Sequence, residues 1–77
     1  MHLKRTLNAV IRLGEESGYV AECLELPVVT QGRTLDEVAA NLREAVSLHL
    51  TEEDLATWGL AAAPILVVTF ELEPAVA

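Results

Sequence analysis

Apolar residues between positions 34 and 50 recur every three or four residues, which is the period of an amphipathic helix. Thr34 is a suitable N-cap, and Glu37 three residues later can complete a capping box. One helical face collects Leu35, Val38, Ala39, Leu42, Ala45, Val46, His49 and Leu50. The pattern therefore predicts a helix over about 35–50, whose apolar face must pack on a sheet made by the rest of the chain.

Four other segments have the alternation or the β-branched composition of strands. They cover about residues 3–13, 19–26, 28–31 and 65–72. The glycine-bracketed segment 14–18 is suited to a hairpin between the first two strands. Pro64 precedes the last strand, which is apolar on both sides until Glu71 and is therefore expected to be covered on both faces.

The element order β-β-β-α-β predicts one α+β domain over residues 1–77. Right-handed crossovers are strongly preferred, so the last strand fits best beside the first and parallel to it. The expected sheet is mixed and four-stranded, with strand order 3-2-1-4 and one main helix on one face. That face is expected to carry Leu3, Leu7, Ala9, Ile11 and Leu13.

Composition points to self-association. Hydrophobic residues make up 52% of only 77 residues, and a chain this short buries a small core. We expect a homo-oligomer, most simply a dimer, with Ile65, Val67 and Thr69 at the interface, formed by strand pairing or by sheet-on-sheet packing. The alternative is that residues 51–63 fold over the last strand and Trp58 fills the gap.

Charge is unevenly distributed along the chain. Residues 1–13 carry three basic and no acidic residues, whereas residues 14–77 carry all twelve acids and two arginines. The net charge of −7 disfavours a phosphate backbone and favours a basic protein partner. The alternative is that acidity only keeps an apolar domain in solution. The candidate partner contacts are expected to cluster in the first hairpin, and they are Glu15, Glu16, Glu22 and Glu25.

The sequence predicts no catalytic, metal or cofactor site. Metal-dependent nuclease chemistry needs convergent carboxylates, but the first strand has Asn8 at its centre and no acid. His49 and Glu53 could share a helix face, yet two ligands are too few for a metal site. Cys23 stands alone, so we expect a small core residue in a reducing cytoplasm and no disulfide. No apolar run is long enough to span a membrane.

Several short motifs resemble the N-terminal domain of HicB-type antitoxins. They are Gly18-Tyr19-Val20-Ala21, Leu26-Pro27, Thr30-Gln31-Gly32, Thr34-Leu35-Asp36-Glu37 and Asn41. Val38 stands where the family usually has alanine, and Val28 where it commonly has glycine. The resemblance covers most of residues 5–50.

The resemblance implies a partial ribonuclease-H-like fold and a non-catalytic role, in which the domain neutralises a HicA-like toxin. Such toxins are small, basic ribonucleases of the double-stranded-RNA-binding type. Many family members also carry a C-terminal DNA-binding domain, but only five residues follow the last predicted strand here. We therefore expect no DNA-binding domain and no direct DNA binding by this chain. The alternative function is a solitary, self-associating structural or ligand-binding domain of the same fold.

Overall fold

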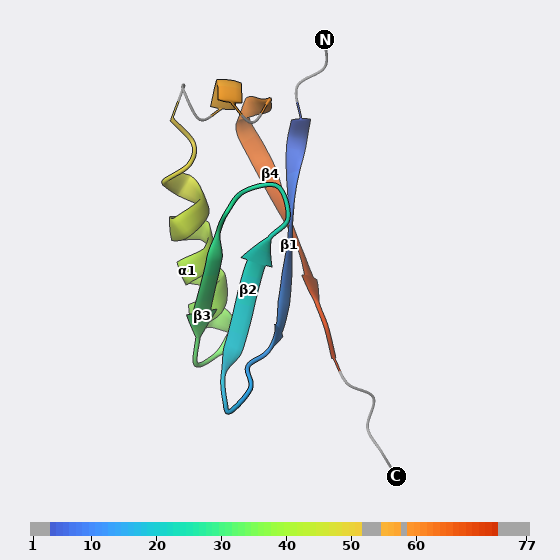
Figure 1. The fold of residues 1–77 in the computed structure, drawn as a ribbon, viewed down its shortest axis with the longest axis vertical. Helices are drawn as coiled ribbons and strands as arrows, with labels where there is room; N and C mark the ends of the chain where they lie inside the picture. Colours follow the sequence, from blue (N-terminus) through green and yellow to red (C-terminus); the bar gives the residue numbers. More distant parts are fainter. Residues whose placement is uncertain (1–3, 52–54, 58, 73–77) are drawn as a thin grey trace.

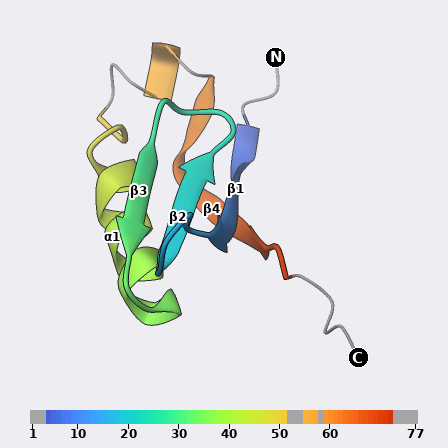
Figure 2. The ribbon, with the colours of Figure 1, turned by 60° about the horizontal axis from the view of Figure 1, so that its bottom comes forward.

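The structure, a computed structural model, describes residues 4–51, 55–57 and 59–72. It consists of a mixed sheet with one long helix on one face. Figures 1 and 2 show this arrangement from two directions. The elements are β1 (Lys4–Leu13), β2 (Tyr19–Cys23), β3 (Val29–Gly32), α1 (Leu35–Ser47) and β4 (Leu60–Phe70). The predicted α+β class, with a four-stranded mixed sheet and one main helix, is confirmed.

The strands lie in the order β3-β2-β1-β4. β1 and β2 are antiparallel, with Ala9 opposite Cys23, and β2 and β3 are antiparallel, with Ala21 opposite Thr30. β4 runs parallel to β1 and places Val67 opposite Asn8. The helical connection thus returns the chain to the side of β1 away from β2, where the sequence predicted the last strand.

Helix α1 begins where the sequence places its N-cap. The Glu37 backbone N–H donates to Thr34 Oγ1 at 3.0 Å, and Asp36 and Glu37 occupy the first turn. The helix ends at Ser47 and not at Leu50, because the His49 N–H donates to the Val46 carbonyl at 2.9 Å. This bond spans three residues, so the last turn tightens and does not continue as α-helix.

The core lies between α1 and the sheet. Val38, Leu42 and Val46 on the helix are buried together with inward-facing residues of the strands, which include Leu7, Ala9, Ile11, Ala21 and Cys23. The helix lies nearest β3 and β2, however, and not centred over β1 as expected. Leu13, predicted to lie on the covered face, is consequently 51% exposed, and Leu3 lies outside the described residues.

β2 and β3 have different ends from those predicted. β2 stops at Cys23 and not at residue 26, because the chain turns back at once: the Cys23 N–H donates to the Val28 carbonyl at 3.0 Å. The Val28 N–H in turn donates to the Leu26 carbonyl at 2.7 Å, which keeps Val28 in the turn. β3 therefore runs from Val29 to Gly32, one residue later than expected.

β4 differs most from the prediction. It begins at Leu60, with Pro64 inside it, and ends at Phe70. A strand at the edge of a sheet tolerates proline, since one side of it has no neighbour to bond. The expectation that this strand is covered on both faces is wrong for the single chain, because Ile65 is 66% and Val67 45% exposed. Trp58, proposed as an alternative cover, lies outside the described residues.

Among the described residues, no helix combines the length and the apolar character that crossing a membrane requires.

Candidate protein-interaction surface

The β1–β2 hairpin turn, residues 14–18, is held against the connection between β3 and α1. The Gly14 N–H donates to the Gly18 carbonyl at 3.0 Å, which closes the turn. Gly18 has a φ of +72°, and a Cβ there would lie 2.6 Å from the Gly32 carbonyl oxygen. Only glycine combines this backbone conformation with so close an approach. The hairpin turn and the start of α1 therefore meet although they lie far apart in sequence.

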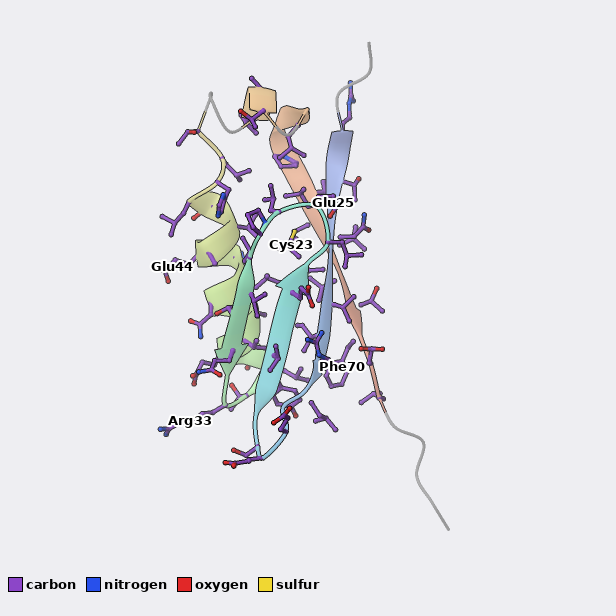
Figure 3. The ribbon with its side chains drawn as sticks, viewed as in Figure 1. Cys23, Glu25, Arg33, Glu44 and Phe70 are labelled. Carbon is purple, nitrogen blue, oxygen red and sulfur yellow. The ribbon has the colours of Figure 1, made fainter. Side chains whose placement is uncertain are left out.

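A shallow hollow of about 610 Å³ lies at this meeting point. Its lining is formed by Gly14, Glu15, Glu16, Ser17, Gly18, Tyr19, Val20, Gln31, Gly32, Arg33 and Glu37. We call this the tip hollow. Three carboxylates and one guanidinium border it, and Figure 3 shows Arg33 pointing away from the body of the domain. The lining thus offers an excess of negative charge to a partner.

Glu15 and Glu16 are the predicted contact residues that lie at the tip hollow. Both are exposed, and within the described part of the chain no hydrogen bond or ion pair occupies their carboxylates. They project from the turn and not from a strand, so they can approach a partner without displacing backbone contacts. The structure therefore leaves them available for intermolecular contact.

Glu22 lies elsewhere. It is on β2, opposite Val10, and faces the side of the sheet away from α1, here called the outer face. Its Oε2 is 3.4 Å from Arg12 Nη1, in an ion pair whose two side chains are about half exposed (46% and 45%). Glu22 therefore lies further along β2 than Tyr19 and Val20, which line the tip hollow.

Glu25 has a structural role. The Asn8 backbone N–H donates to Glu25 Oε1 at 2.8 Å, and Asn8 Nδ2 donates to Oε2 at 2.8 Å. Cys23 Sγ lies 3.9 Å from Oε1. Figure 3 shows Glu25 reaching from the β2–β3 connection toward β1. The carboxylate replaces the backbone acceptor that β2 would supply if it continued past Cys23; we call this contact the Glu25 clamp.

The four predicted contact acids therefore do not form one cluster. The expectation that they lie together is wrong. The four residues are close in sequence, but their side chains point in different directions in the fold. Sequence reasoning also missed Glu37 and Arg33 as neighbours of Glu15 and Glu16. The signal for that contact was two glycines: Gly18 lets the hairpin turn approach the Gly32 carbonyl, and Gly32 lets the start of α1 approach β3.

The predicted interface residues Ile65, Val67 and Thr69 all lie on the outer face and are exposed. They adjoin the outer-face residues of β1, since Ile65 is opposite Thr6, Val67 opposite Asn8 and Thr69 opposite Val10. These three residue pairs carry no charge themselves, but the Glu25 carboxylate contacts Asn8 Nδ2, and the Arg12–Glu22 pair lies further along the outer face. Contact with a partner at these residues stays a prediction.

Among the residues that the structure describes, no group of three or more His, Cys, Asp or Glu side chains could hold a metal ion. Cys23 is a free, buried thiol in the core, as its place on a strand predicted. Glu53, which on sequence alone is a possible metal ligand together with His49, lies outside the described residues.

No protein-family model, no curated protein and no solved structure matches the chain. The similarity to HicB-type antitoxins therefore rests on the motif residues themselves.

Proposed function

We propose that the chain is a non-catalytic, HicB-like antitoxin-type module that binds and neutralises a small basic HicA-like ribonuclease toxin, and that its sheet and helix form a partial ribonuclease-H-like fold. The observation that carries the proposal is the position of the motif residues: Gly18, Gly32 and Glu37 line the tip hollow, and Thr34 caps the Glu37 N–H beside it. The motif thus contributes Glu37 and the glycine backbone to an acidic surface that Glu15 and Glu16 of the hairpin turn complete.

Each motif residue has a physical reason to be there. Gly18 allows the two turns to touch, Gly32 allows α1 to pack closely on β3, and Thr34 caps that helix. Asn41 adds a further link, because its Nδ2 donates to the Gln31 carbonyl at 2.8 Å and ties α1 to β3. These contacts support a rigid platform for Glu15 and Glu16, and rigid placement reduces the entropy lost on binding.

Charge supports the class of partner. A basic protein approaching the tip hollow meets Glu15, Glu16 and Glu37 against a single arginine. Complementary charge raises the association rate and depends on ionic strength, whereas an acidic surface repels nucleic acid. The proposal therefore assigns RNA to the toxin and leaves this chain a protein-binding role.

Isothermal titration of a HicA-like toxin into the chain tests the surface. Exposed ion pairs contribute about 0.2–1 kcal/mol each, so a Glu15→Gln/Glu16→Gln variant should bind about 2- to 30-fold more weakly at low salt, with about 1.4 kcal/mol per tenfold change. The wild-type affinity should itself fall as salt is raised.

The matched comparison uses two single variants with the same net charge. Glu44 is exposed on α1 and projects away from the sheet in Figure 3. We expect Glu16→Gln to weaken toxin binding and Glu44→Gln to leave it nearly unchanged. Equal effects of the two variants would assign the attraction to net charge alone and reject the tip hollow as the contact surface.

A further inference from the structure

The two edges of the sheet differ. At one edge, β3 lies against α1, and Asn41 Nδ2 of the helix donates a hydrogen bond to the Gln31 carbonyl. At the other edge, β4 pairs with β1 on one side, and no described strand lies on its other side. Natural proteins protect such edges with charges, bulges or covering segments, because an unpaired strand templates pairing with another chain.

The backbone of β4 shows which groups face the open edge. The Glu71 N–H donates to the Ile11 carbonyl at 2.9 Å, so the backbone groups of Glu71 point to β1. Successive residues of a strand direct these groups to opposite sides. The N–H and C=O groups of Leu66, Val68 and Phe70 consequently point to the open edge.

Pro64 has no N–H to offer, and the β1–β4 register shifts between the Lys4–Leu60 and Thr6–Ile65 pairs, so the regular run of available donors begins at Leu66. The donors thus occupy a defined stretch of the strand and are not spread over its whole length.

Charge identifies the partner for this edge. Residues 60–70 contain no charged side chain, while the whole chain carries twelve acids against five basic residues. Two copies of the chain repel each other over most of their surfaces and can meet most easily along this uncharged strand. Its side chains are also apolar and accessible, with Ile65 66% and Val68 41% exposed.

From these observations we infer that β4 pairs antiparallel with β4 of a second copy, about a two-fold axis at Val68, and joins the two sheets into one. This dimer goes beyond toxin binding and does not depend on it. Val68 lies opposite Val68 of the partner subunit, and Leu66 lies opposite the partner's Phe70. All three open-edge residues then exchange backbone hydrogen bonds with the partner.

Other registers are worse. Moving the axis two residues toward the N-terminus places Pro64 opposite Val68 and loses a donor. In the inferred register Glu71 lies opposite Ile65 of the partner subunit, so no two carboxylates meet. An isologous contact of this kind closes at two copies and does not propagate into a fibre.

Sedimentation of two variants tests the inference. Val68→Pro removes a donor at the open edge and keeps the β1–β4 pairing, so it should sediment as a folded monomer while the wild type sediments as a dimer. Val67→Lys places a charge on the outer face, which stays uncovered in the inferred dimer, and should remain dimeric. The reverse pattern would assign the contact to sheet-on-sheet packing and overturn the inference, as would a monomeric wild type at high micromolar concentration.

Amide exchange on the wild-type protein gives a second readout that does not depend on the fold of Val68→Pro. The amides of Leu66, Val68 and Phe70 should be protected at high concentration and lose protection on dilution. Rapid exchange of these three amides in a protein that sediments as a dimer would also reject strand pairing at β4.

Discussion

The Glu25 clamp makes a sharp prediction, because one side chain completes a backbone ladder. The Leu24 N–H still donates to the Asn8 carbonyl at 2.8 Å, but the chain then leaves the sheet, and the Asn8 N–H of β1 needs another acceptor. The Glu25 carboxylate accepts from that N–H and from Asn8 Nδ2, both at 2.8 Å. Glu25→Ala removes both bonds, whereas Asn8→Ala removes only the bond to the side chain.

The magnitude follows from charge and exposure. Hydrogen bonds to charged groups contribute about 1.5–3 kcal/mol each, but these bonds are open to solvent, which lowers the figure. We expect Glu25→Ala to lower the free energy of unfolding by about 1–3 kcal/mol. Asn8→Ala should cost about 0.5–1.5 kcal/mol, and the double variant should cost less than the sum of the two.

Thermal melts and amide exchange measure these effects. For a domain of this size, each kcal/mol shifts Tm by about 4–8 °C. The Asn8 amide should exchange faster in Glu25→Ala than in the wild type, while amides of the β1–β4 ladder change less. The control is Glu22→Ala, which breaks only the half-exposed Arg12–Glu22 pair and should cost about 0–1 kcal/mol. If Glu25→Ala has the same Tm as Glu22→Ala and the wild type, the Glu25 carboxylate does not complete the ladder.

Two further substitutions test the contacts around the start of α1. Thr34→Ala should lower the free energy of unfolding by about 0.5–2 kcal/mol by removing the cap on the Glu37 N–H, with Thr34→Ser as a control that retains it; a melt equal to wild type would place the helix start elsewhere. Gly32→Ala should cost about 1–3 kcal/mol or more, since the new Cβ would lie 2.5 Å from the Val38 backbone nitrogen, and an unchanged denaturant midpoint would show that the β3–α1 turn can move apart.

Local signals in the sequence predicted much of the fold. The N-cap at Thr34, the glycine-bracketed hairpin and the alternation of β1 each depend on residues close together in the chain. The position of β4 beside β1 followed from the handedness of crossover connections and from its apolar character. These features are specified by steric and hydrogen-bonding preferences that act over a few residues.

Features that depend on distant contacts could not be read in the same way. No glycine marks the C-terminal end of the helix, so the apolar pattern predicts a helix that continues to residue 50, whereas α1 ends at Ser47. The sequence predicts that the last strand begins after Pro64, whereas β4 begins at Leu60, because sequence does not reveal which side of a strand will be an edge. The sequence predicts Glu25 as a partner contact, since nothing local indicates that its carboxylate reaches Asn8.

Inhibition of RNA cleavage tests the proposed function most directly. A HicA-like toxin is incubated with RNA, and increasing amounts of the chain are added. The account predicts that cleavage falls in proportion to the added chain and stops near equimolar amounts, while the chain alone leaves the RNA intact with or without divalent metal. Undiminished cleavage in the presence of excess chain, or cleavage by the chain itself, would contradict the proposal of a non-catalytic antitoxin-type module.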